Sequence, residues 1–135
     1  DTFVVCFTGN LGKYQGLEAV IDAAVLLQSD NVEFHLYGNG SRKASLQERA
    51  SELAADNVYF HDHISLPHVM HVLSRCDVAL LPLAQKIYRV AHPSKLPIYL
   101  ASRRRVVAVI EPHSELARMI GRLGIGSGGC VHTQW

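Results

Sequence analysis

The chain has 135 residues, of which 48% are hydrophobic and 19% charged, and its formal net charge at pH 7 is +1. This length suits one domain with a real core and argues against two. The small net charge creates no overall field that would attract nucleic acid or an anionic membrane, so we expect no nucleic-acid partner. No apolar stretch approaches the roughly 18–20 residues of a transmembrane helix.

Three cysteines, Cys6, Cys76 and Cys130, are widely spaced and lie in or beside apolar stretches. An odd number without a repeated spacing argues against a disulfide framework and fits a reducing compartment. No signal peptide is visible, and the abrupt start and end suggest a piece of a longer protein. We therefore expect a cytoplasmic location.

The first half of the chain alternates apolar runs with amphipathic segments. Thr2–Phe7 is a β-branched, aromatic run that predicts a buried strand, and apolar positions at helical spacing predict a helix from Gly16 to about Gln28. The elements that we expect next are a strand at 32–37, a helix that starts at Ser41 or Ser45 and runs to about Ala55, a strand at 57–60, and a short helix at 67–74 with Ser65 as its N-cap.

The second half continues the same alternation. We expect a strand at 77–81, a loop at 82–92, a helix at 94–102, a strand at 105–110, a helix at 114–123, a glycine-rich stretch at 124–129 and a last short strand at 130–131. The strands are continuous apolar runs, which indicates burial on both faces. Strict alternation of strand and helix then predicts one α/β domain over residues 1–135, with a parallel sheet that helices cover on both faces.

Ligands of such sheets bind outside the carboxyl ends of the strands. The first strand is followed there by the turn Gly9–Gly16, and a later helix begins at Pro93-Ser94-Lys95. A glycine-rich turn before a helix leaves backbone N–H groups pointing outward at the positive helix end, where an anion binds. The second helix start adds a hydroxyl and a cation. Two such helix ends facing one cleft predict a diphosphate site.

The glycine turns also have a purely structural explanation. The spacing in Gly9–Gly16 fits neither a Walker A loop nor the dinucleotide fingerprint, and Lys43 stands where the third glycine would follow Gly38-x-Gly40. Tight turns that need a positive φ would account for either group of glycines. For Gly38–Gly40 taken alone we regard this explanation as the better one.

A cluster of histidines suggests zinc, which binds this type of side chain. The cluster comprises His61, His63, His68 and His71, with Cys76 nearby. The rings of a His-x-His pair in a strand point to one side, but no second close pair completes a known zinc spacing. We therefore favour a polar cleft edge and predict no metal site.

The basic triplet at 103–105 lacks aromatic interleaving and a wider basic stripe. Those features would be expected of a surface that binds nucleic acid. We interpret the triplet as a solvated turn or a contact with a partner domain.

With these features together, the sequence resembles the C-terminal, nucleotide-sugar-binding half of retaining GT-B glycosyltransferases, specifically the group 1 (GT4) family. Within that family it is most similar to bacterial capsule, O-antigen and exopolysaccharide transferases. The order and spacing of the motifs are kept from about residue 3 to 125, nearly the whole chain. The matching segments are Phe7–Gly12, Gln15–Leu17, His35–Gly40, Asn57–Phe60, Ser74–Leu83, Pro93–Leu96 and Tyr99–Ala101.

The resemblance implies a single Rossmann-like domain that binds a UDP- or GDP-sugar donor without a cofactor or a metal. The residues that it implies for the diphosphate and the transferred sugar are Gly9, Asn10, Gly12, Lys13, Pro93, Ser94 and Lys95. Those that it implies for the nucleoside are Gly38, Gly40, His61, His63 and Ile98. Helix ends and cations would stabilise the leaving nucleoside diphosphate as its charge develops. No residue is assigned a catalytic role.

The sequence departs from the family pattern at several positions. Val90 and Ile98 stand where many members carry the two glutamates of an E-x7-E motif, the second of which usually contacts the donor ribose. The arginines at 103–105 replace a usual Gly-x-Pro, and Asn10 and Gln15 stand where many relatives have Arg and Lys. A degenerate α/β binding or interaction module that has lost donor chemistry is therefore the main alternative. An unrelated α/β nucleotide binder is the next.

GT-B enzymes react in a cleft between two Rossmann-like domains, so the resemblance implies an N-terminal acceptor domain that is absent from these 135 residues. The chain alone would not form a complete transferase. The implied partners are the nucleotide-sugar, that N-terminal domain and, through it, a lipid-linked acceptor at the membrane surface. The implied location is the cytoplasm, with room for peripheral contact with the inner face of the membrane in the full-length protein.

Overall fold

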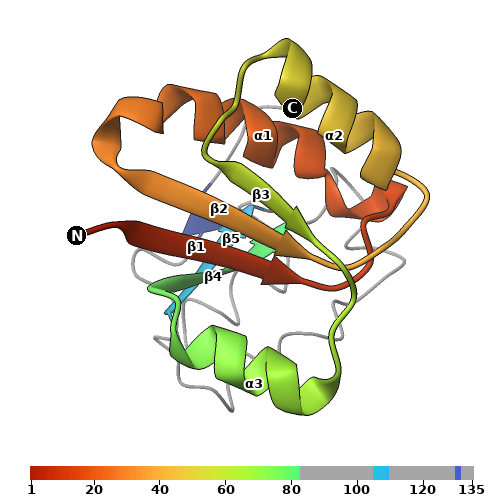
Figure 1. The fold of residues 1–135 in the computed structure, drawn as a ribbon, viewed down its shortest axis with the longest axis vertical. Coiled ribbons are helices and arrows are strands. Elements are labelled where there is room, and N and C mark those ends of the chain that lie inside the picture. Colours follow the sequence, from red (N-terminus) through yellow and green to blue (C-terminus); the bar gives the residue numbers. More distant parts are fainter. Residues whose placement is uncertain (83–104, 110–129, 132–135) are drawn as a thin grey trace.

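The strands form one parallel sheet. The computed structural model describes residues 1–82, 105–109 and 130–131. Within these ranges the strand order is β3-β2-β1-β4-β5-β6, and every pairing is parallel (Figure 1). The strands are β1 Phe3–Thr8, β2 Val32–Tyr37, β3 Val58–His61, β4 Val78–Pro82, β5 Arg105–Val109 and β6 Cys130–Val131. The predicted parallel α/β architecture is thus confirmed.

The helices begin close to the positions that the sequence predicts. The helical segments are η1 Lys13–Gln15, α1 Leu17–Leu26, η2 Gln28–Asp30, α2 Lys43–Glu52 and α3 Leu66–Ser74, of which η1 and η2 are 3₁₀ turns. Ser65 is the N-cap of α3 as predicted, with its hydroxyl 3.0 Å from His68 Nδ1. Neither Ser41 nor Ser45 caps α2, which has Arg42 as its N-cap, because backbone hydrogen bonds to the preceding turns fix where this helix begins.

Helices cover both faces of the described sheet. α1 and α2 pack on one face of β1, β2 and β3, and α3 lies on the opposite face (Figure 1). The apolar cluster under α1 and α2 includes the fully buried residues Phe7, Leu11, Leu17, Ile21, Leu36 and Leu46. The helices expected at 94–102 and 114–123 lie outside the described residues, and so does the loop expected at 82–92 except for Pro82, which is the last residue of β4. In the described part of the chain, no helix combines the length and the apolar content needed to cross a membrane.

The expectation that every strand is buried on both faces is wrong for β2 and β3. In β2 the buried residues are Phe34 and Leu36, and the residues between and beside them are partly exposed. The pairing of β2 with β3 groups the polar and aromatic side chains of Glu33, His35, Tyr37, Tyr59 and His61 on the face away from α1 and α2. β3 lies at the sheet edge, and the side chains on this face form hydrogen bonds and ring stacks with one another, so they need no covering helix. The central strand β1 behaves as predicted, with all residues from Val5 to Thr8 buried.

The strand order reverses at β1, which has β2 on one side and β4 on the other. Ligands of open parallel sheets bind at the carboxyl ends beside such a reversal. At the opposite ends of these strands the Asp77 carboxylate accepts a hydrogen bond from Val4 N–H at 2.7 Å, and Asp77 N–H donates to the Val4 carbonyl at 2.8 Å. The fold therefore fixes β1 against β4 and leaves the turn after β1 at the expected ligand position.

Candidate functional site

The turns that follow β1 and β2 are joined to each other by backbone hydrogen bonds. Gly9 N–H donates to the Tyr37 carbonyl and Leu11 N–H donates to the Asn39 carbonyl, both at 3.0 Å. Arg42 N–H donates in return to the Leu11 carbonyl at 2.9 Å. The expectation that the amides of the first turn point outward to a ligand is therefore wrong for Gly9 and Leu11, because the fold itself uses these two N–H groups.

Glycine makes this close approach of the two turns possible. Gly9 and Gly38 have φ of +146° and +148°, in the region that only glycine adopts readily. A Cβ on Gly38 would lie 1.8 Å from the Gly9 carbonyl oxygen, and one on Gly40 would lie 2.5 Å from the Leu11 carbonyl oxygen. Gly16, with φ of +62°, is the N-cap of α1. The explanation that these glycines serve tight turns with a positive φ is confirmed for Gly9, Gly16 and Gly38. The close contacts of Gly38 with Gly9 and of Gly40 with Leu11 also hold both turns at the carboxyl edge of the sheet.

Exposed polar side chains surround these turns. The Asn10 amide lies over two glycines, since a Cβ on Gly12 would lie 2.5 Å from its Nδ2 and one on Gly40 would lie 2.7 Å from its Oδ1. Exposed polar residues of the three strand-end turns include Asn10, Lys13, Asn39, Asp62 and His63. Amide, ammonium and imidazole groups at one sheet edge are donors suited to a phosphorylated ligand rich in hydroxyl groups. The structure thus places the predicted residues Gly9 to Lys13 together after β1.

The ring of His61 belongs to the polar face of the sheet. Its Nε2 lies 2.9 Å from His35 Nδ1, and the ring stacks on Tyr37 with the centroids 4.3 Å apart. His35 Nε2 lies in turn 3.0 Å from Glu33 Oε1. Burial, and then the charges of His35 and Lys43, lower the pKa of His61. The ring of His61 therefore contacts side chains of β2. The backbone carbonyl of His61 is the part that contacts the turn after β2, because it accepts a hydrogen bond from Gly38 N–H.

The structure separates His61 from His63. β3 ends at His61, so the alternation of side chains along a strand does not extend to His63, which is exposed. The prediction that the rings of His61 and His63 point to the same side of one strand is therefore wrong. In residues 1–82, 105–109 and 130–131 no group of three or more potential ligands could hold a metal ion.

We expect the chain to lose stability as the pH falls from about 7 to about 5, because the folded state lowers the pKa of His61. The unfolded chain then binds the proton more readily than the folded one. The contribution of His61 to the free energy of unfolding is complete above the pKa of this residue in the unfolded chain, which is near 6.5. That contribution is lost as the pH falls through the lower pKa of His61 in the folded chain. Urea denaturation across this range measures the effect. H61Q should flatten the profile and H63Q should not; an unaltered slope in H61Q would refute this assignment.

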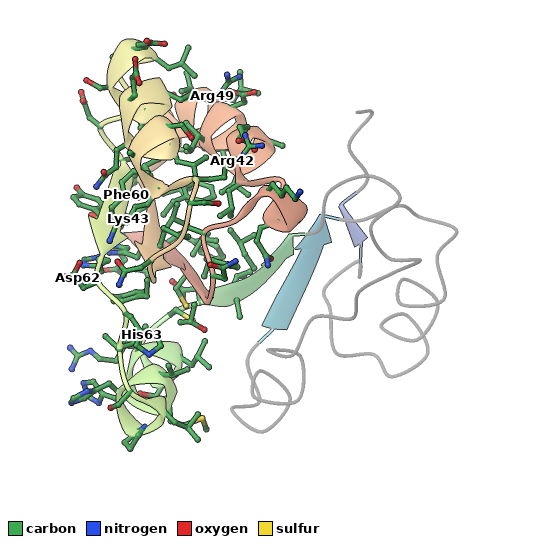
Figure 2. The ribbon with its side chains drawn as sticks, turned by 90° about the vertical axis from the view of Figure 1, so that its right-hand side faces the viewer. Arg42, Lys43, Arg49, Phe60, Asp62 and His63 are labelled. Carbon is green, nitrogen blue, oxygen red and sulfur yellow. The ribbon has the colours of Figure 1, made fainter. Side chains whose placement is uncertain are left out.

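Lys43 lies in the site although no motif in the sequence marks it as a site residue. Its Nζ lies 3.1 Å from Asn39 Oδ1, 3.2 Å from the His61 carbonyl oxygen and 3.3 Å from Asp62 Oδ1 (Figure 2). The sequence carried no signal for this role, because the expected helix start was Ser41 or Ser45 and the acceptors of the Lys43 ammonium belong to separate segments of the chain.

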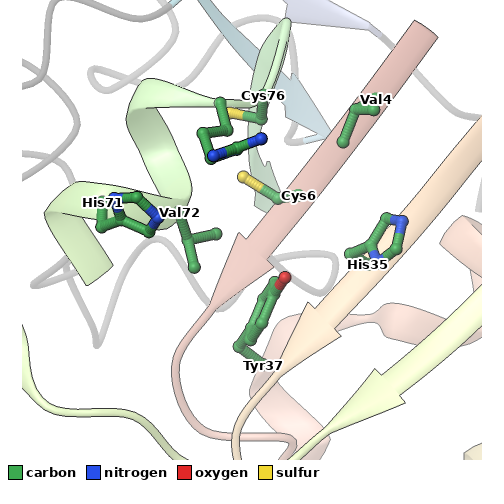
Figure 3. Close-up of a pocket in the computed structure, with 8 residues that line it drawn as sticks. Val4, Cys6, His35, Tyr37, His71, Val72 and Cys76 are labelled. Atoms are coloured by element: carbon green, nitrogen blue, oxygen red, sulfur yellow. The ribbon is translucent and has the colours of Figure 1, made fainter. Parts of the chain in front are cut away.

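A separate cavity of about 260 Å³ lies on the other side of the sheet, between α3 and strands β1 and β2 (Figure 3). Its lining residues are Val4, Cys6, His35, Tyr37, His71, Val72, Arg75 and Cys76. Binding sites for small molecules have volumes of roughly 300–1,000 Å³. This cavity is smaller than that, and of these eight lining residues Tyr37 alone lies at the carboxyl end of a strand, so we do not place the nucleotide there.

Several predicted site residues lie outside the described part of the chain. They are Pro93, Ser94, Lys95 and Ile98, together with Val90, Arg103 and Arg104. The described turns therefore represent one side of the predicted diphosphate site.

A parallel sheet with this strand order, and a glycine turn after its first strand, defines the Rossmann-like class of nucleotide-binding folds. Residues 2–125 match the family described as glycosyl transferases group 1, and the chain belongs to this family.

Two known glycosyltransferases are among the proteins similar to this chain. It is 30% identical over 120 residues to the probable glycosyltransferase WbjE of Pseudomonas aeruginosa, covering 89% of this chain and 30% of the relative. It is 30% identical over 116 residues to the putative colanic acid biosynthesis glycosyl transferase WcaI of Escherichia coli, covering 86% of this chain and 28% of the relative. The chain therefore spans less than a third of the length of these relatives.

Solved structures support the same fold. The glycosyltransferase WaaG, involved in lipopolysaccharide biosynthesis, superposes with a TM-score of 0.75 at 16% identity over 99% of this chain and 34% of WaaG. HepE from Anabaena, solved in complex with UDP-glucose, superposes with a TM-score of 0.65 at 20% identity over 89% of this chain and 32% of HepE. At these identities the likeness establishes the GT-B type of fold.

Proposed function

We propose that this chain is the C-terminal, donor-binding domain of a retaining group 1 (GT4) glycosyltransferase that synthesises a bacterial surface polysaccharide. The observation that carries the proposal is the pair of joined glycine turns at the carboxyl ends of β1 and β2, beside the reversal of strand order. Membership of the family supports it. Relatives whose descriptions refer to colanic acid and lipopolysaccharide biosynthesis support the type of product.

The proposed ligand is a UDP- or GDP-linked sugar, which agrees with the UDP-glucose complex of HepE. We place its diphosphate and sugar at the turn after β1. The residues proposed for them are Gly9, Asn10, Gly12, Lys13, Pro93, Ser94 and Lys95. Those proposed for the nucleoside are Gly38, Gly40, His61, His63 and Ile98, with His61 acting through its backbone because its ring is bonded to His35.

The chemistry that this domain would support is loss of the nucleoside diphosphate from the donor sugar. Negative charge grows on the distal phosphate as its bond to the sugar breaks. An exposed cation such as Lys13 at the phosphate turn stabilises that charge. The proposal needs neither a resident metal nor a cofactor.

The acceptor and the remaining catalytic groups would come from elsewhere in a longer protein. The chain covers 30% and 28% of the two curated relatives. We therefore propose an N-terminal acceptor domain and, through it, a lipid-linked acceptor as partners. A cytoplasmic enzyme that contacts the inner face of the membrane peripherally fits this arrangement.

Isothermal titration of the 135-residue chain with UDP, GDP and a dinucleotide tests the proposal. We expect UDP or GDP to bind with a dissociation constant below about 1 mM, and the dinucleotide not to bind. Lys13→Ala should weaken binding about tenfold, because a charge-assisted hydrogen bond to phosphate is lost. Arg75→Ala removes an exposed cation at the end of α3 and serves as the control. Absence of nucleotide binding at millimolar concentration would overturn the proposal.

The rival is an α/β interaction module that has lost donor chemistry. The replacement of the usual ribose-binding glutamate by Ile98 favours it. A stable chain that binds neither UDP nor GDP would establish this alternative.

A further inference from the structure

Lys43 joins three separate segments at the carboxyl edge of the sheet. The acceptors of its ammonium group belong to the turn after β2, to the last residue of β3 and to the turn after β3. The carbonyl of His61 also accepts a hydrogen bond from Gly38 N–H at 3.1 Å. The ammonium thus reinforces the point where the proposed nucleoside turns meet.

The environment of Lys43 is unfavourable for a cation unless the ammonium group donates hydrogen bonds to nearby acceptors. Its side chain is 18% exposed, and it is the first residue of α2, where the helix dipole repels positive charge. Asp62 is 93% exposed, so its ion pair with Lys43 is screened and contributes little. The amide oxygen of Asn39 and the carbonyl of His61 are therefore the contacts that matter for holding the ammonium in place.

The same contacts occupy the ammonium group of Lys43. An ammonium group has three N–H donors. Three acceptors lie within hydrogen-bonding distance of Nζ, so its donors are occupied within the protein. A ligand at this edge would meet the turns that Lys43 holds, and not the ammonium itself.

We propose that Lys43 is a positioning residue for the nucleoside part of the donor. It holds the turn at Gly38–Gly40 against the turn at His61–His63, and so keeps the nucleoside subsite in a shape that can bind. The diphosphate would lie at the turn after β1, which is held by backbone hydrogen bonds and by Leu11. The inference rests on the proposed function, since it assumes that these turns bind a nucleotide.

The proposal predicts a selective loss in Lys43→Met, which keeps most of the apolar stem and removes the ammonium. The dissociation constant for UDP or GDP, whichever the wild-type chain binds, should rise about tenfold or more. The dissociation constant for inorganic pyrophosphate should stay within about twofold, because the backbone hydrogen bonds of Gly9 and Leu11 and the buried Leu11 side chain still hold the phosphate turn. Titration calorimetry at a temperature where circular dichroism shows both proteins folded gives the two values.

Two further variants sharpen this test. Lys43→Arg keeps a cation and should recover part of the nucleotide affinity. Arg49→Met removes a cation from the same helix, where it pairs with Asp22 of α1 at 2.9 Å, and should leave both affinities unchanged.

The outcomes separate the two proposals. Equal weakening of nucleotide and pyrophosphate binding in Lys43→Met, or no weakening of either, would overturn the positioning role. Failure of the wild-type chain to bind any nucleotide would instead overturn the proposed function.

Discussion

Gly38→Ala is expected to lower the free energy of unfolding by about 3 kcal/mol or more. The new Cβ would lie 1.8 Å from the carbonyl oxygen of Gly9 and 3.0 Å from its carbonyl carbon. Both are backbone atoms, so no side-chain rotation relieves the clash. The φ of +148° adds strain, because alanine adopts this region poorly. Single domains have only about 5–15 kcal/mol of stability, so much of the variant should be unfolded at 37 °C.

Gly12→Ala is the matched control for this substitution. Its Cβ would lie 2.5 Å from Asn10 Nδ2, which is the end of an exposed side chain that can rotate away. We therefore expect a loss of about 1 kcal/mol or less, and a smaller loss still when Asn10 is also alanine. Urea denaturation followed by circular dichroism compares the variants. If Gly38→Ala proved as stable as Gly12→Ala, the close contact between the two turns would not exist in solution.

The sequence was sufficient to predict those parts of the fold in which the local hydrophobic pattern agrees with the burial of the side chains. β1 and β4 are apolar runs in the centre of the sheet, and the periodic apolar residues of α1 belong to the core cluster that also contains Phe7 and Leu80. The glycine turn after β1 marked the ligand edge because a parallel sheet presents its carboxyl ends there. Each of these inferences depends on residues that are close together in the chain.

The parts that the sequence did not predict depend on contacts between distant segments. The N–H groups of Gly9 and Leu11 are bonded to the turn after β2, which no local pattern in either turn reveals. The start of α2 at Lys43 follows from the same contacts, and so do the acceptors of its ammonium group. The ring of His61 was expected at the ligand edge, but its pairing with His35 requires the register between β2 and β3.

Leu11→Ala is expected to destabilise the chain by about 2–5 kcal/mol, as do other truncations of fully buried leucines. Leu11 is the apolar residue within the proposed phosphate turn, and its side chain is 0% exposed in the core under α1 and α2. Its backbone N–H and carbonyl also bind the neighbouring turn. The side chain therefore anchors the turn to the core, and its truncation should loosen the site as well as the fold.

Leu73→Ala separates these two effects. Leu73 is also 0% exposed, but it lies on α3, on the opposite face of the sheet. Both variants should lose similar stability in urea denaturation. At a temperature where both remain folded, only Leu11→Ala should weaken UDP or GDP binding, by about tenfold. Equal nucleotide affinity in the two variants would show that the turn keeps its shape without its anchor. The glycines and backbone hydrogen bonds would then suffice to position the phosphate turn.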